Sequence, residues 1–203
     1  MSKLNLDDNQ LTSVPASLEN HSSLQDLDLS NNHLNSLPAE LGQLAALVTL
    51  NLSDNQLTRV PAALGQLAIL SVLYLFGNQL TSVPASRGSL SLLSWLCLDG
   101  NQLTSVPAEL GILAALKQLH LTGNPKLTSL HAELYHRLST LNDVAHLDKS
   151  LVTLIAAAHR FAEAAQSGDD TAQVLLAQCC LQRCRRAGTR SREGPRARRI
   201  LVP

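Results

Sequence analysis

"LNLSDNQL", residues 50–57, decides the fold, because the chain repeats its frame of leucines and asparagine and changes only the letters between them. Close copies occur as LDLSNNHL at 27–34, LYLFGNQL at 73–80 and LCLDGNQL at 96–103. The asparagine of the frame recurs every 23 residues, as Asn9, Asn32, Asn55, Asn78, Asn101 and Asn124. A fixed period of this length is typical of stacked repeat units. The sequence therefore predicts six units of 23 residues.

Each unit predicts a short strand followed by a return arm. Leu50 and Leu52 alternate with polar residues, as in a strand with one buried face, and each repeat places the next strand about 4.8 Å further along, in parallel. We expect the asparagine side chains to bond the backbone where each strand bends, which is a structural role rather than a binding role. The prolines lack an N–H and belong on the return arm, ahead of a helical turn or 3₁₀ segment. They are Pro15, Pro38, Pro61, Pro84 and Pro107.

The frame Leu-x-Leu-x-x-Asn, followed by LPAELG at 37–42 or VPAELG at 106–111, resembles a known family. It is similar to the 23-residue intracellular leucine-rich repeats of Ras-associated, scribble-type and plant intracellular Ras-group proteins. The resemblance covers residues 1–139. It implies an α/β fold, a right-handed leucine-rich-repeat solenoid or horseshoe whose parallel sheet lines a concave face. It also implies a protein-binding role, and makes a small GTPase one candidate partner without identifying it.

The repeat pattern is broken at one position, and it stops before the C-terminal part of the chain. Arg87 occupies the position that leucine fills in the other repeats, so we expect a charged side chain to turn outward from a core site. After the repeats, residues 140–186 predict a helical region that caps the exposed apolar end of the array. Residues 187–203 predict a disordered, arginine-rich tail.

Aromatic side chains gather on the predicted concave face. Its outward positions hold Tyr74, Phe76 and Trp95, although the chain has only 1 Trp, 2 Tyr and 2 Phe. Because their strands are adjacent, we expect the three rings to meet diagonally and to form an exposed apolar patch that anchors a protein partner. The alternative is that the rings only cover one another.

Charged residues flank this patch on the same face. Asp26 and Asp28 make the first half of the face acidic, which either selects a basic partner edge or is an ordinary solvated surface. Asp99 and His120 lie at outward positions of the last two strands. The predicted partner-binding residues are therefore Tyr74, Phe76, Trp95, Asp26, Asp28, Asp99 and His120.

Other classes of function lack a motif in the sequence. Without a Ser, His and Asp arrangement of recognised spacing or a Gly-rich phosphate loop, the chain predicts no enzyme activity and no cofactor. Cys179, Cys180 and Cys184 lie close together but lack a fourth ligand, so we predict plain thiols and no metal site. The cysteine pattern and the lack of a signal peptide favour a cytoplasmic location, and no apolar run is long enough for a transmembrane segment.

These observations predict a non-catalytic protein–protein interaction module, or scaffold, that binds its partner on the concave face in intracellular signalling. One alternative is a substrate-recognition arm or fragment of a larger signalling protein or ubiquitin ligase. Another alternative is a tether that binds nucleic acid or an anionic membrane through the basic tail.

Overall fold

The computed structural model describes residues 1–84 and 90–127, together with Leu130 and Leu134. The chain divides into two compact units, residues 1–155 and 156–203, and every described residue lies in the first. Arg87, the predicted helical cap at 140–186 and the predicted tail at 187–203 lie outside the described residues. The six predicted strands all fall within the described ranges.

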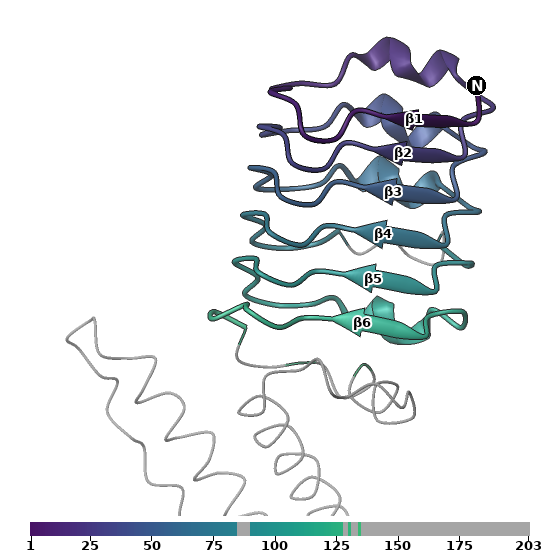
Figure 1. The fold of residues 1–203 in the computed structure, drawn as a ribbon. Helices are drawn as coiled ribbons and strands as arrows, with labels where there is room; N and C mark the ends of the chain where they lie inside the picture. Colours follow the sequence, from purple (N-terminus) through teal and green to yellow (C-terminus); the bar gives the residue numbers. More distant parts are fainter. Residues whose placement is uncertain (85–89, 128–129, 131–133, 135–203) are drawn as a thin grey trace, which may run out of the picture. The chain divides into compact units, whose positions relative to one another are not determined.

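Six short strands form one parallel sheet, in the order of the sequence (Figure 1). Each residue pairs with the residue 23 positions later, so Leu27 lies opposite both Leu4 and Leu50. The same register continues to the last strand, which confirms the predicted parallel stacking. The strands are β1 (Lys3–Asn5), β2 (Asp26–Asp28), β3 (Thr49–Asn51), β4 (Val72–Tyr74), β5 (Trp95–Cys97) and β6 (Gln118–His120).

Short 3₁₀ helices form the return side of the array, as the prolines predict. Each follows a proline in extended conformation, such as Pro38 with φ −70° and ψ 147°. The ring fixes φ near this value, and proline has no N–H to leave unpaired at a helix start. In the described part of the chain, no helix is long and apolar enough to cross a membrane. The 3₁₀ helices are η1 (Ala16–Asn20), η2 (Ala39–Gln43), η3 (Ala62–Gln66) and η4 (Ala108–Ile112).

Leucines fill the space between the sheet and the 3₁₀ helices. Leu50 and Leu52 point inward from β3 and its exit, Leu57 follows the bend, and Leu67 follows η3; all four side chains are fully buried. Burying one leucine contributes about 1.5 to 3 kcal/mol. Because each repeat adds leucines at the same positions, the core is one continuous column along the array.

The asparagines hold the bends together, as the sequence predicts. The side-chain Nδ2 of Asn55 lies 2.9 Å from the carbonyl of Leu29 in the preceding repeat, and 3.2 and 3.0 Å from those of Leu52 and Ser53 in its own. Its Oδ1 accepts the N–H of Leu34 at 2.9 Å. One buried amide thus satisfies backbone groups in two neighbouring repeats. The same contacts recur at Asn32, Asn78 and Asn101.

The residue before each of these asparagines has a left-handed backbone. Its φ is positive in every repeat, from 51° to 69°, a region that asparagine, aspartate and glycine adopt at the lowest cost. The sequence has only those three residue types at this position, so the left-handed backbone is a second periodic signal beside the leucines and asparagines. They are Asp8, Asn31, Asp54, Gly77, Gly100 and Gly123.

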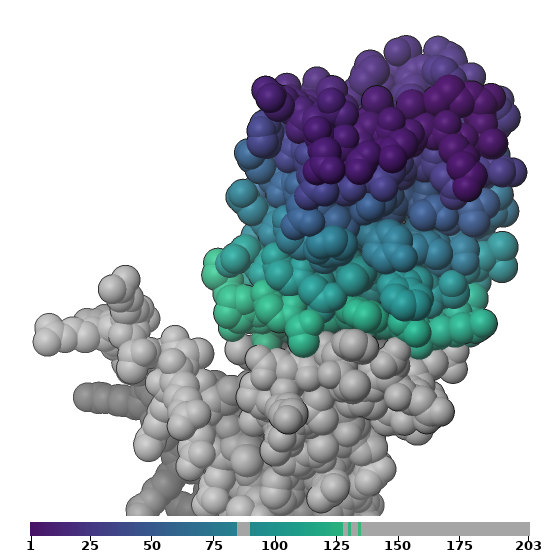
Figure 2. Space-filling view, viewed as in Figure 1, coloured from purple at the N-terminus to yellow at the C-terminus, as the bar shows by residue number. Residues whose placement is uncertain are grey.

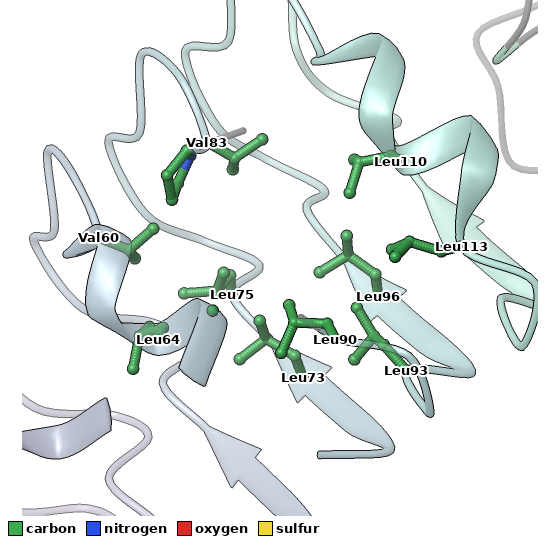
Figure 3. Close-up of a pocket in the computed structure, with 12 residues that line it drawn as sticks. Val60, Leu64, Leu73, Leu75, Val83, Leu90, Leu93, Leu96, Leu110 and Leu113 are labelled. Atoms are coloured by element: carbon green, nitrogen blue, oxygen red, sulfur yellow. The ribbon is translucent and has the colours of Figure 1, made fainter. Parts of the chain in front are cut away.

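A small apolar cavity of about 40 Å³ interrupts the core (Figure 3). Leu73, Leu75 and Leu96 line it from the strand side, while Leu64 of η3 and Leu110 of η4 line it from the return side. Leu64 and Leu110 are the leucines that precede and follow position 87 in the repeat period. The cavity is therefore lined by the leucines one repeat before and one repeat after Arg87, which itself lies outside the described residues.

We predict that Asn55→Ala destabilises the array by about 3 kcal/mol, because each buried backbone group left without a partner costs about 1 to 3 kcal/mol. Asn9→Ala is the matched control, since the exposed amide of Asn9 donates only to the carbonyls of Leu6 and Asp7 in its own repeat. Urea unfolding of both variants measures the difference. Equal losses at the two positions would contradict the proposed role of the buried amides.

Gly100 tests the left-handed position separately from packing. A Cβ at Gly100 would meet its nearest neighbouring atom at 3.5 Å, an ordinary contact, while φ there is +62°. Gly100→Val should therefore lose about 2 kcal/mol more than Gly100→Asn, because a β-branched residue is much more strained in this region than asparagine. Asn31 already adopts φ 52° at the same repeat position. Thermal unfolding compares the two variants, and similar midpoints would exclude backbone strain as the constraint.

Leucine can be restored at position 87, where the other repeats carry it. We predict that Arg87→Leu stabilises the array by about 1 to 2 kcal/mol, because it puts apolar surface in place of a charged side chain at a position that leucine fills in other repeats. Arg59→Leu is the control, because Arg59 is exposed and lies outside the core. Denaturant unfolding measures both. A lower midpoint for Arg87→Leu would show that the arginine has a stabilising partner.

Candidate protein-binding site on the strand face

The strand face is the surface formed by the side chains on either side of each central leucine. On β4 these are Val72 and Tyr74, which flank the buried Leu73 and are both partly exposed. Figure 2 shows the molecule from the strand side, with the repeats as stacked bands from purple to green. All seven predicted partner-binding residues lie on strands β2, β4, β5 and β6 or directly after them: Asp26, Asp28, Tyr74, Phe76, Trp95, Asp99 and His120.

The aromatic residues do not form the three-ring cluster that the sequence analysis expected. Trp95 stacks on His120 of the next strand, with ring centroids 5.5 Å apart and planes 29° apart. Tyr74 and Phe76 make no ring contact with Trp95 within the described ranges. Trp95 is diagonal to both Tyr74 and His120 in the strand register, and its indole packs on the planar imidazole.

Exposure differs among the three aromatic residues. Phe76 follows β4 and is 37% exposed, so its ring is available to a partner. Tyr74 and Trp95 are only partly exposed, and the indole Nε1 of Trp95 is buried without a hydrogen-bond acceptor among the described residues. Phe76 is therefore the more independent probe of binding, while Trp95 also takes part in packing.

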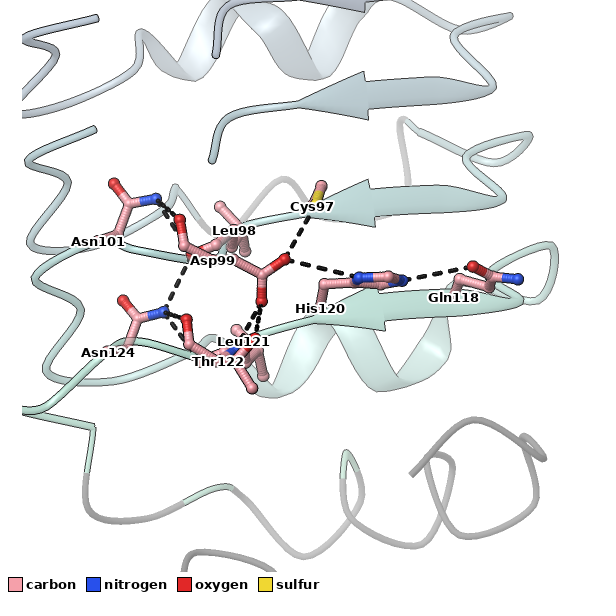
Figure 4. Close-up of polar contacts among 9 residues, drawn as sticks. All are labelled: Cys97, Leu98, Asp99, Asn101, Gln118, His120, Leu121, Thr122 and Asn124. Atoms are coloured by element: carbon pink, nitrogen blue, oxygen red, sulfur yellow. Dashed lines mark hydrogen bonds and ion pairs between the residues drawn. The ribbon is translucent and has the colours of Figure 1, made fainter. Parts of the chain in front are cut away.

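A polar cluster lies where β5 and β6 end (Figure 4), and its His120 is the residue that stacks on Trp95. The thiol of Cys97 donates to Oδ2 of Asp99, with sulfur and oxygen 3.1 Å apart. Nδ1 of His120 lies 3.5 Å from the same oxygen, which forms an ion pair when the imidazole is protonated. Burial, together with the hydrogen bond to Asp99, raises the pKa of the Cys97 thiol to about 12. The thiol is therefore protonated at neutral pH.

The repeat pattern predicts Asp99 and His120 on this face, but a contact of either residue with Cys97 was not predicted. Cys97 and His120 pair directly in the register of β5 and β6. Because the two residues are 23 positions apart, which is one repeat, their pairing could have been predicted from the sequence. Residues one repeat apart become neighbours wherever they point outward from adjacent strands.

The acidic end of the strand face is partly neutralised. Oδ2 of Asp26 lies 3.0 Å from the ammonium of Lys3. Hydrogen bonding from Lys3 lowers the pKa of Asp26. Asp28 instead accepts from Ser30 through both its N–H and its hydroxyl, and from the side-chain amide of Asn51. Both carboxylates thus have partners on the face itself.

The seven predicted residues therefore form two groups. Tyr74, Phe76, Trp95, Asp99 and His120 lie on β4 to β6 or just beyond their ends, and Asp26 and Asp28 lie on β2. Strand β3 separates the groups and contributes the polar residues Thr49 and Asn51 to the same face. The β4–β6 group alone combines aromatic area with hydrogen-bonding side chains.

Comparison with known proteins agrees with this architecture. A family model described as a leucine-rich repeat region matches residues 4–187. A search of curated protein sequences finds no match.

Two solved structures resemble the chain. The leucine-rich repeat protein LIC12759 of Leptospira interrogans is 36% identical, with a TM-score of 0.56, and the match covers 68% of this chain and 41% of that protein. The leucine-rich repeat domain of the type III effector XCV3220 (XopL) is 26% identical, with a TM-score of 0.60. That match covers 64% of this chain and 47% of the effector structure. The chain thus spans less than half the length of either.

The family match and the geometry lead to one assignment. The parallel strands, the buried asparagines and the 3₁₀ return arms repeat with the period of the sequence motif. Domains of this kind are non-enzymatic and bind proteins. The chain belongs to the leucine-rich repeat family, and its repeat array is a protein-interaction module.

Proposed function

We propose that the array binds its protein partner on the strand face of β4 to β6. The observation that carries this proposal is Phe76, which is 37% exposed, beside the partly exposed Tyr74 on the strand face. An aromatic ring gains contact area on binding and loses little conformational freedom, so it is a frequent anchor of interfaces. The core does not explain its presence, because leucines at fixed positions fill the core.

Polar groups beside the aromatic residues supply specificity. Gln118 lies opposite Trp95 in the strand register, and Asp99 lies against His120, whose ring stacks on the indole; both carry oxygen acceptors. A partner segment with one apolar side chain and adjacent hydrogen-bond donors fits this set. Asp26 and Asp28 lie apart from these residues. Their charges affect the rate at which a partner associates more than the strength of the aromatic anchor.

The same site suits more than one cellular role. We propose a cytoplasmic adaptor or scaffold in signalling, which is consistent with the buried free thiol of Cys97. A recognition arm of a larger protein is the second candidate. It is supported by the two similar structures, of which the chain covers 41% and 47%, and one of which is a domain of a type III effector. In both cases the strand face carries the recognition.

Alanine variants test the proposed anchor. Once a partner has been captured with the intact protein, Phe76→Ala should weaken binding by about 2 kcal/mol and leave the thermal midpoint nearly unchanged. Trp95→Ala should weaken binding to a similar degree, but with some loss of stability, because its ring also stacks on His120. Calorimetric titration and thermal unfolding measure the two effects separately.

Ile112→Ala is the matched control, since this large apolar side chain is 67% exposed but lies at the end of η4, on the return side. It should bind as tightly as the parent. Unchanged affinity in Phe76→Ala and Trp95→Ala, with a loss in Ile112→Ala, would place the interface on the return side instead.

A further inference from the structure

Three metal-ligating side chains converge on the strand face, at the ends of β5 and β6. The candidate ligand atoms of Cys97, Asp99 and His120 all lie within 4.8 Å of one another. The sulfur of Cys97 lies 3.1 Å from Oδ2 of Asp99, and Nδ1 of His120 lies 3.5 Å from the same oxygen. Figure 4 shows the thiol and the imidazole directed at this carboxylate from two strands.

The separations of 3.1 and 3.5 Å match the spacing of ligands around a tetrahedral metal. With bonds of about 2.0 to 2.3 Å, the ligand atoms around a zinc ion lie roughly 3 to 4 Å apart. The sulfur, oxygen and nitrogen donors suit zinc, whereas magnesium and calcium prefer oxygen alone. We propose that Cys97, Asp99 and His120 form a zinc-binding site with three protein ligands and a fourth position open to water.

Neighbouring side chains already orient two of the three ligands. Nε2 of His120 lies 3.3 Å from Oε1 of Gln118, and in the tautomer that donates from Nε2 to this oxygen the lone pair of Nδ1 faces Asp99. The backbone N–H of Thr122 donates to Oδ1 of Asp99 at 2.8 Å, and its hydroxyl donates to the same oxygen. Oδ2 of Asp99 therefore remains directed at Cys97 and His120. Outer contacts of this kind are a regular feature of metal sites, where they fix the direction of the ligands.

The site is accessible from solvent on the strand face. The side chains of His120 and Asp99 keep 15% and 26% of their exposed area, while Cys97 lies below them and is buried. A buried sulfur with two more exposed ligands above it places the open fourth position toward solvent. The proposal does not depend on the identity of a protein partner, because the three ligands belong to one chain.

Cobalt absorption tests the sulfur ligand directly. The full-length chain is prepared with Cys179, Cys180 and Cys184 changed to serine, so that Cys97 is its one remaining cysteine. Addition of Co²⁺ should produce a thiolate-to-cobalt charge-transfer band that excess Zn²⁺ removes. Cys97→Ser in the same background should abolish the band, and circular dichroism checks that the variant remains folded. Absence of the band in the triple-serine chain, or its persistence in Cys97→Ser, would overturn the proposal.

Zinc affinity tests the other ligands. In competition with a chromophoric chelator, His120→Gln and Asp99→Asn should each weaken zinc binding at least about tenfold, the lower end of the loss known even for outer contacts of metal sites. His33→Gln is the matched control, because His33 is exposed and lies outside the cluster. Equal affinities for His120→Gln, His33→Gln and the parent would exclude His120 as a ligand.

Discussion

The rest of the structure depends on the buried asparagine amide between neighbouring repeats. Asn55 bonds carbonyls of its own repeat and of the preceding one, and accepts the N–H of Leu34, so two bends are fixed by one side chain. These bonds hold the strands at one register along the whole sheet. The left-handed residue before each asparagine turns the chain into position for them. Because the bends repeat, outward side chains at the same repeat position line up along the strand face.

Most of the framework could be predicted from the sequence, because its physical demands recur in every repeat. The alternating leucines, the asparagines and the prolines gave the strands, the bends and the 3₁₀ segments. The left-handed position could also have been predicted, because every repeat has Asp, Asn or Gly there. This signal lies in polar residues and glycines, whereas the strands are predicted from apolar residues. Arg87 broke the leucine pattern, and the leucines one repeat before and after it, Leu64 and Leu110, line a small cavity.

The site was less predictable, since outward side chains are not constrained by the repeat. The sequence placed Trp95 on the correct face, but its choice between Tyr74 and His120 as a neighbour depends on ring orientation, which periodicity does not encode. Lys3 similarly removed part of the acidic character expected at Asp26. The proximity of Cys97 and His120 could have been predicted, because residues one repeat apart on adjacent strands lie side by side.

The identical register between successive repeats has a consequence for how such a gene can change. Deleting or duplicating one whole repeat by recombination within the coding sequence would leave every remaining bend with the same kind of neighbour. The hydrophobic column would become shorter or longer without a new type of packing. The outward rows, in contrast, would be rearranged at once: removing the unit that carries β5 would bring Tyr74 opposite His120 and delete Trp95, Cys97 and Asp99 together. Recombination of whole units can therefore exchange recognition surfaces while the scaffold stays intact.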